Sequence, residues 1–237
     1  MLSCCKLKES HMKILVFCLL AVLNHSPALA QVARQITMDI QGNSPVISFL
    51  VDESIIVNIS QEGTILDFGI ENNSVYNYHF KLDKYMGRVD HYSANDNEAF
   101  QGKIKYIGRT LFTYYSASEN DMFRGKIKTI GTIRFSYFTG YDDEAFRGKI
   151  KEAGLLSFNW YGSIDNEAFK GKLKTVGGTP LTYYAAYDDK AYKGKIKSIG
   201  TTSYTYYSFY DRQEYRGAMK TGNRTPNING IKYLIKY

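Results

Sequence analysis

The chain has 237 residues, of which 44% are hydrophobic, and a formal net charge of +7 at pH 7. Its three cysteines, Cys4, Cys5 and Cys18, all precede residue 31, which excludes disulfides, thiolate metal ligands and cysteine nucleophiles from the rest of the chain. Residues 1–30 hold three lysines and one glutamate, so the remainder carries +5. This moderate charge lacks the dense positive stripe of a nucleic-acid binder, and we expect no nucleic acid as a partner.

Residues 1–30 have the pattern of a signal peptide. Lys13 precedes an apolar run from Ile14 to Leu23, and the segment ends in Ala28-Leu29-Ala30, the form that a signal peptidase cleaves. Met12 is an alternative start of translation. The apolar run is too short to span a membrane stably, so no membrane span is expected. We predict cleavage after Ala30 and export to the periplasm, the cell surface or the extracellular space.

The two ends of the remaining chain are predicted to be strands outside the repeats. Residues 31–84 contain the strand-like runs ISFLV, SIIVNI, GTILDFGI and VYNYHFKL, separated by glycine and asparagine. We interpret them as an N-terminal β cap that covers the edge of the central sheet. Residues 223–237 combine a loop, NRTPNING, with the alternating segment IKYLIKY, which we expect to be the closing strand.

Residues 85–222 contain a repeat of 23 residues. A glycine returns with nearly the same neighbours each time, as in AFRGKIKEAG and AYKGKIKSIG. A fixed period of this size indicates stacked supersecondary units. A shortened unit, Tyr85 to Val89, precedes the full copies. The repeated glycines are Gly102, Gly125, Gly148, Gly171, Gly194 and Gly217.

Each repeat is predicted to be a β-hairpin. Phe146 and Ile150, two residues before and after a repeat glycine, follow the alternation of a strand. Gly154 then suits a tight turn, and Phe158 and Trp160 share one face of the second strand. The expected fold class is therefore all-β: an elongated antiparallel meander of tandem 23-residue hairpins with an N-terminal β cap.

Several families have a similar pattern. The hairpin period, with Phe146-Arg147-Gly148 at its start, resembles the MORN repeat, although Ile150 occupies that family's tryptophan position. YDRQEYRG and YDDKAYKGKI are similar to the YD-type repeats of Rhs proteins, with a longer gap between aspartate and glycine. The chain also resembles uncharacterised secreted bacterial proteins with tandem G-[KR]-[IL]-x-x-I-G…Y-Y units. That likeness covers roughly residues 85–222 and implies a fold without an established activity.

Lysine and aromatic residues are predicted to form two rows on one exposed face of the repeats. Strands near 4.8 Å apart place equivalent residues of successive repeats about 10 Å apart. Cations and rings at this spacing fit a repetitive anionic glycan, through ion pairs and ring stacking. The alternative is a solvated face whose lysines discourage aggregation. The candidate binding residues are Lys103, Lys126, Lys149, Lys172 and Lys195, with Tyr115, Phe138, Tyr161, Tyr184 and Tyr207.

Carboxylates recur in the loops between hairpins, as Asp142 and Glu144 illustrate. Periodic, near-identical copies are typical of turn-forming and solubilising residues, whereas a catalytic site is one exceptional place. A weak calcium loop is an alternative. After residue 30 the only histidines are His79 and His91, and neither has a second histidine or cysteine at metal-ligand spacing. We expect no catalytic residue, no metal site and no cofactor.

These observations favour an exported, non-enzymatic repeat protein, a binding or structural module at the periplasm or cell surface. Its expected partner is an anionic polysaccharide or another component of the cell envelope. An outer-membrane β-barrel is an alternative, which the hairpin period, the abundant tyrosine and the C-terminal aromatic residue favour, although the apolar strands are short for it. A secreted glycan hydrolase is the third alternative.

Overall fold

The computed structural model describes residues 33–52, 54–72 and 81–236. The predicted leader at residues 1–30, the predicted start at Gln31 and His79 lie outside these residues. The described part consists of strands, turns and loops, with two short 3-10 turns, Asp121–Phe123 and Gln213–Tyr215. The predicted all-β fold class is confirmed.

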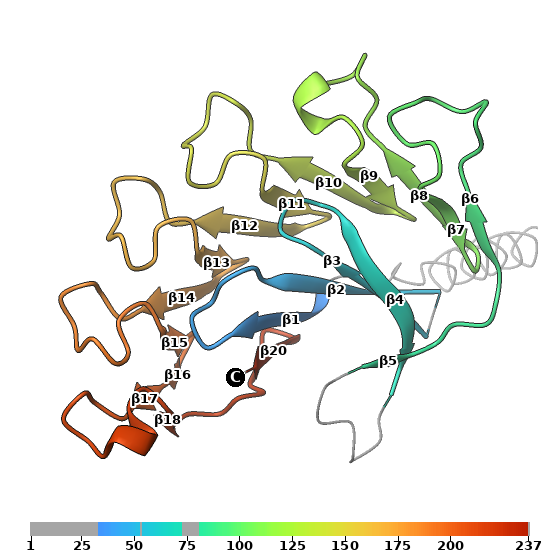
Figure 1. Ribbon diagram of the computed structural model, residues 1–237. Helices are drawn as coiled ribbons and strands as arrows, with labels where there is room; N and C mark the ends of the chain where they lie inside the picture. Colours follow the sequence, from blue (N-terminus) through green and yellow to red (C-terminus); the bar gives the residue numbers. More distant parts are fainter. Residues whose placement is uncertain (1–32, 53, 73–80, 237) are drawn as a thin grey trace, which may run out of the picture. The chain divides into compact units, whose positions relative to one another are not determined.

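A seven-stranded sheet combines the N-terminal segment with the C-terminal strand (Figure 1). All neighbouring strands in it are antiparallel except β1 and β20, which run parallel. The C-terminal segment is thus a strand, as expected, but it closes the N-terminal sheet and not the repeats. In spatial order the strands are β19 (Asn227–Ile228), β20 (Ile231–Lys236), β1 (Ala33–Asp39), β2 (Val46–Val51), β3 (Ile55–Ile59), β4 (Ile65–Glu71) and β5 (Leu82–Asp83).

The repeats form an eleven-stranded antiparallel meander, in which each strand pairs with its neighbours in the chain. A loop projects outward between successive hairpins (Figure 1). The predicted meander of tandem hairpins is confirmed. Its strands are β6 (Val89–His91), β7 (Ile104–Ile107), β8 (Thr110–Tyr114), β9 (Ile127–Ile130), β10 (Ile133–Tyr137), β11 (Ile150–Ala153), β12 (Leu156–Trp160), β13 (Leu173–Val176), β14 (Thr179–Tyr183), β15 (Ile196–Ile199) and β16 (Thr202–Ser203), followed by a separate pair, β17 (Thr205–Tyr206) and β18 (Met219–Thr221).

The first strand of each full repeat begins two residues after the repeat glycine, later than the sequence predicts. The glycine has φ between 71° and 75°, a left-handed conformation that suits glycine, and the aromatic residue before it lies in the loop. In β9, Ile127 and Ile130 are both buried although they are three residues apart. The reason is a β-bulge: Ile127 pairs with Tyr114 and Thr129 with Thr113, so Lys128 is the extra residue.

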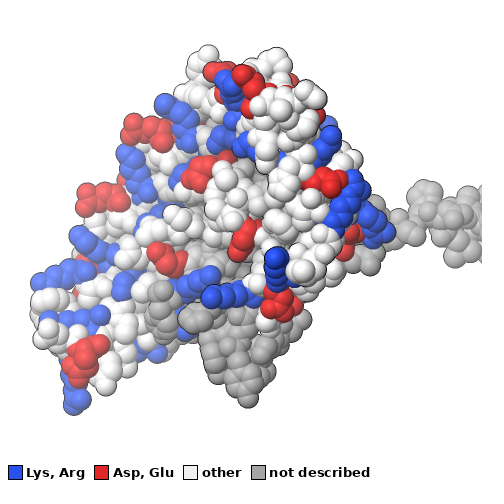
Figure 2. Space-filling model, turned by 45° about the vertical axis from the view of Figure 1, so that its right-hand side comes forward, with Lys and Arg blue, Asp and Glu red and all other residues white. Residues whose placement is uncertain are grey.

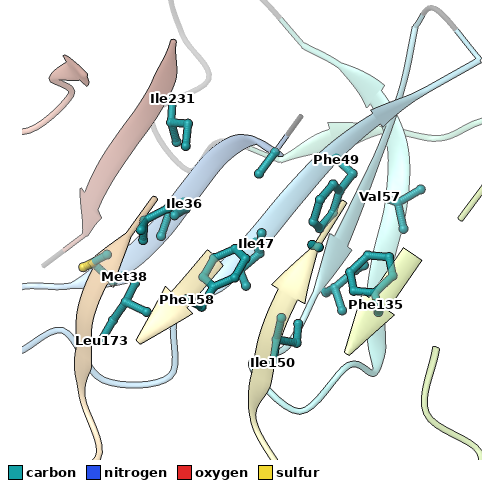
Figure 3. Close-up of a cluster of buried hydrophobic side chains, with 14 of the residues drawn as sticks. Ile36, Met38, Ile47, Phe49, Val57, Phe135, Ile150, Phe158, Leu173 and Ile231 are labelled. Atoms are coloured by element: carbon teal, nitrogen blue, oxygen red, sulfur yellow. The ribbon is translucent and has the colours of Figure 1, made fainter. Parts of the chain in front are cut away.

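The two sheets pack face to face and share one hydrophobic core (Figure 3). Ile47 and Phe49 of β2 lie in this core with Phe135 and Phe158 of the repeats, and all four side chains are fully buried. The rings of Phe49 and Phe135 meet edge to face, with their centres 5.3 Å apart. The N-terminal segment therefore covers a face of the repeat sheet, where the sequence led us to expect a cap at its edge.

Backbone hydrogen bonds attach two turns of the N-terminal sheet to particular repeats. The amide of Ile150 donates to the carbonyl of Gln61 at 2.8 Å. The amide of Ile196 donates to the carbonyl of Ile40 at 2.9 Å. Because each turn meets a defined repeat, these contacts fix the register between the two sheets, and the repeats are not interchangeable.

Candidate functional site

The predicted lysine row, which we call the inner lysines, links successive repeats. Lys103 is exposed, and the other four lysines are half-buried. The Nζ atom of each half-buried lysine donates to the carbonyl of the next repeat glycine, at 2.6 Å from Lys126 and 2.7 Å from Lys172. These bonds give the inner lysines a role in holding the sheet together. The pairs are Lys126–Gly148, Lys149–Gly171, Lys172–Gly194 and Lys195–Gly217.

Each inner lysine also lies over a core-facing aromatic ring of its own repeat. The Nζ atom of Lys149 is 4.6 Å from the ring centre of Trp160, a distance at which a cation and a ring attract each other. Burial lowers the pKa of all four half-buried lysines and brings that of Lys172 to about 8. The pairs are Lys103–Tyr114, Lys126–Tyr137, Lys149–Trp160, Lys172–Tyr183 and Lys195–Tyr206.

Two of the inner lysines also hold the turns of the N-terminal sheet. The Nζ atom of Lys126 donates to the carbonyl of Glu62 at 3.0 Å, and that of Lys172 donates to the carbonyl of Gln41 at 2.7 Å. Two turns that are far from the repeats in sequence are thereby bound by the same kind of side chain. The structure thus shows structural contacts for these lysines, while their binding of a glycan stays a prediction.

The predicted aromatic row lies between neighbouring repeats and is largely covered. The hydroxyl of Tyr161 donates to the carbonyl of Leu181 at 3.0 Å, and its ring centre is 4.6 Å from that of Phe169. Tyr115 and Tyr184 make the equivalent hydrogen bonds. Each member contacts the ring eight residues later: Tyr115–Phe123, Phe138–Phe146, Tyr161–Phe169, Tyr184–Tyr192 and Tyr207–Tyr215.

A second lysine row, which we call the outer lysines, stands over this aromatic row. The Nζ atom of Lys174, for example, is 5.0 Å from the ring centre of Tyr161. The structure therefore pairs the aromatic row with the outer lysines, whereas the sequence led us to pair it with the inner ones. The outer lysines are Lys105, Lys128, Lys151, Lys174, Lys197 and Lys220, of which the last four are exposed; Lys105 lies over Tyr92, the ring that precedes the row.

Four consecutive loops each carry one large, exposed apolar side chain. We call these four side chains the tip residues. They are Tyr141, Ile164, Tyr187 and Tyr210, and at least 86% of each is exposed. All four occupy the position sixteen residues after a repeat glycine. We did not single them out in the sequence, although an apolar residue at one fixed position of an otherwise polar loop is a signal that the repeat alignment contains.

The loop carboxylates are used to build and connect the loops. Asp142 accepts hydrogen bonds from the amide and hydroxyl of Thr139 in its own loop, at 2.5 and 2.8 Å. Asp143 accepts from the hydroxyl and amide of Ser163 in the next loop, at 2.5 and 2.8 Å. These bonds hold the pKa of both carboxyl groups below the usual range. The geometry is that of turn-forming residues.

The described part of the chain contains no cluster of side chains that could bind a metal ion. No group of three or more His, Cys, Asp or Glu side chains there is placed to hold a metal ion. His91 is an exposed residue of β6. Among the described residues there is also no helix long and apolar enough to cross a membrane.

Comparison with protein-family models, with curated proteins and with solved structures finds no match for this chain. The function must therefore be inferred from the surfaces described above.

We expect the free energy of unfolding to rise with pH above about pH 8 and to be highest near pH 10. Lys172 has a folded-state pKa of about 8, lowered from 10.5, so between these values the unfolded chain binds more protons and stability rises with pH. Burial raises the pKa of Tyr183 above its ordinary 10.0, so above pH 10 the unfolded chain loses protons first and stability falls. Urea unfolding at pH 7, 9 and 11 measures both slopes. A Lys172→Met variant serves as the control, because its free energy of unfolding should rise less between pH 7 and pH 9. Equal free energies of unfolding at pH 7 and pH 9 in the unaltered protein would contradict the expectation.

Proposed function

We propose that the protein is an exported, non-enzymatic binding module that holds an extended polysaccharide of the cell envelope along its repeats. The row of tip residues carries this proposal. Exposed apolar residues on soluble proteins are usually scattered without order, whereas these four recur at one position of successive repeats, which favours an interaction surface. The signal-peptide pattern of residues 1–30 supports export.

The spacing of the tip residues favours a polymer as the ligand. Successive repeats are about 10 Å apart, which is comparable to the length of a disaccharide, so the four tips cover roughly 30 Å. A ligand with a regular repeat offers the same contact to each loop. Several weak contacts to one chain then act together and raise the overall affinity without requiring a deep pocket.

The chemistry of the tips favours sugar rings. Tyrosine presents a flat, rigid surface and a hydroxyl group, and it loses little conformational entropy on binding. Tyr141, Tyr187 and Tyr210 can stack on the C–H faces of sugars, and Ile164 extends the apolar row. The outer lysines repeat at the same interval and supply cations for acidic sugars, which supports an anionic polysaccharide as the partner.

The loop carboxylates support a non-enzymatic role. Asp142 and Asp143 are occupied by hydrogen bonds that shape the loops, and their lowered pKa values keep them ionised at neutral pH. A glycosidase requires one carboxylic acid with a raised pKa as proton donor. The acidic and basic side chains alternate along the loop edge on the left of Figure 2, which gives this edge a mixed charge.

The decisive variant changes Tyr141, Tyr187 and Tyr210 together to serine. Each ring contact contributes about 0.5–1.5 kcal/mol beyond its buried area, so we expect the Kd for the polysaccharide to rise at least tenfold. The thermal unfolding midpoint should hardly change, because these side chains are at least 86% exposed. Calorimetric titration with a neutral and an acidic polysaccharide measures the effect.

A matched variant changes Lys151, Lys174 and Lys197 to glutamine. It should weaken binding of the acidic polysaccharide only, and it should reduce the salt dependence of that binding. The two variants together separate ring stacking from ion pairing. Unchanged affinity in both, with folding intact, would leave the protein a structural repeat and refute the binding module.

A further inference from the structure

A cavity of about 600 Å³ opens between the two sheets at the base of the central loops. The N-terminal sheet contributes Gln61 and the turn at residues 42–44, and the repeats contribute the segments around Lys149 and Lys172. Its volume lies within the range of small-molecule sites. Unlike the tip residues, this cavity does not follow the repeat, because its lining depends on where the N-terminal turns meet the repeats.

The cavity exists because those turns are bound two repeats apart. Lys126 donates to the carbonyl of Glu62, and Lys172 donates to that of Gln41. Lys149 occupies the same position in the repeat between them. Among the described residues its Nζ atom donates to the carbonyl of Gly171, and no turn carbonyl of the N-terminal sheet accepts a second bond. Lys149 therefore keeps donor capacity at the wall of the cavity.

The lining is rich in cations and hydrogen-bond donors. Lys149, Lys170 and Lys172 line the cavity against one carboxylate, Glu167. Lys170 also pairs with Glu144 at 3.0 Å, outside the lining. Asn43, Ser44 and Gln61 add amide and hydroxyl groups. Clustered ammonium groups beside amide and hydroxyl donors are suited to an anionic oxygen ligand.

The backbone contacts between the N-terminal segment and the repeats also differ next to Lys172. The amides of Ile127, Ile150 and Ile196 each donate to a carbonyl of the N-terminal segment. Leu173 is the equivalent residue in the repeat between the last two, and within the described chain no turn carbonyl accepts its amide. Between Ile150 and Ile196, this contact is therefore missing in the repeat of Lys172, which lines the cavity.

We propose that this cavity binds a small anion that carries a carboxylate or phosphate group, with Lys149 as the main contact and Lys172 beside it. The site is independent of the tip residues and of the proposed polysaccharide binding, since its lining contains none of the tip residues and a small free anion can reach Lys149 without them. Carboxylate and phosphate present the same anionic oxygen atoms to an ammonium group, so the experiment has to distinguish them.

The chain contains its own reporter for this site. Trp160 is the single tryptophan, and it occupies a position where the other full repeats have tyrosine. It is buried, and its ring centre is 4.6 Å from the Nζ atom of Lys149. An anion that binds Lys149 changes the charge next to the indole, so the fluorescence of Trp160 should change on binding.

The test titrates the full chain at fixed ionic strength with glucuronate, inorganic phosphate, chloride and glucose, and follows Trp160 emission. We expect a saturable change with glucuronate or phosphate, whichever is the ligand class, and none with chloride or glucose. Lys149→Met should raise the Kd at least tenfold. Lys195→Met is the matched control, because Lys195 is an inner lysine with the same glycine contact but does not line the cavity.

Three results would overturn the proposal. They are no saturable change with either acid in the unaltered protein, an equal change with chloride, and an equal loss of affinity in the Lys149 and Lys195 variants. If Lys149→Met does not fold, Lys170→Gln replaces it, since Lys170 is an exposed lining residue and its loss should still weaken binding severalfold. Calorimetric titration of the same ligands gives a second measurement that does not depend on Trp160.

Discussion

Replacing Phe158 by alanine is expected to lower the free energy of unfolding by about 3–5 kcal/mol. Phe158 lies in β12, pairs with Val176 and is fully buried between the two sheets (Figure 3). Its loss removes a large ring and leaves a cavity that strands on both sides cannot fill without moving. Because the core is shared, we expect both sheets to lose stability in one transition.

Leu155→Ala provides the control in the same hairpin. Leu155 lies in the turn before β12 and is 92% exposed, so its truncation should change the free energy of unfolding by less than about 0.5 kcal/mol. Denaturation in urea, followed by circular dichroism, measures both variants. A small effect of Phe158→Ala, close to that of Leu155→Ala, would show that the two sheets do not share a core.

The hairpin array could be predicted because its signals are local and repeated. Two glycines per repeat mark turns, and buried positions such as Phe158 and Trp160 alternate in the strand between them. The start of the first strand was misplaced. Ile127 and Ile130 are three residues apart, a spacing that strict alternation does not allow, and only a bulge at Lys128 places both in the core.

The position of the N-terminal sheet could not be predicted from local patterns. Its strands alternate well enough to be recognised, but which face they cover depends on contacts such as Phe49 with Phe135, more than 80 residues apart. The same long-range packing decides the environment of the inner lysines. Lys172 belongs to a row that looks solvated in the sequence, but in the structure it is half-buried and bound to the turn with Gln41.

The candidate surfaces also differ in whether the sequence alone could reveal them. The outer lysines and the tip residues follow the repeat, so a careful alignment of the copies is sufficient to find them. The cavity at Lys149 breaks the repeat, because it requires two turns bound at Lys126 and Lys172 with a gap between them. A site of that kind becomes visible only when the register between the two sheets is known.

That register leads to the second large effect: Gly63→Ala should cost about 2–5 kcal/mol of stability, through strain and a lost hydrogen bond. Gly63 has φ of 83°, and an added Cβ atom would lie 2.6 Å from the Cζ atom of the Tyr137 ring, well inside contact distance. Tyr137 is buried, and its hydroxyl donates to the carbonyl of Ile127 at 2.7 Å. If the Tyr137 ring moves, its hydrogen bond to Ile127 is lost. If the turn at Gly63 moves, the N-terminal sheet is displaced from the repeats.

Gly230→Ala isolates the strain from the clash. Gly230 has nearly the same φ, 79°, but no atom lies within 4 Å of an added Cβ. Its substitution should cost only the backbone strain, about 1–2 kcal/mol. Urea unfolding of the two variants gives the difference, which measures how firmly the turn at Gly63 is bound to the repeats. An equal loss of stability in the two variants would mean that the turn at Gly63 moves without resistance. The register between the two sheets, on which the cavity depends, would then not be fixed by this turn.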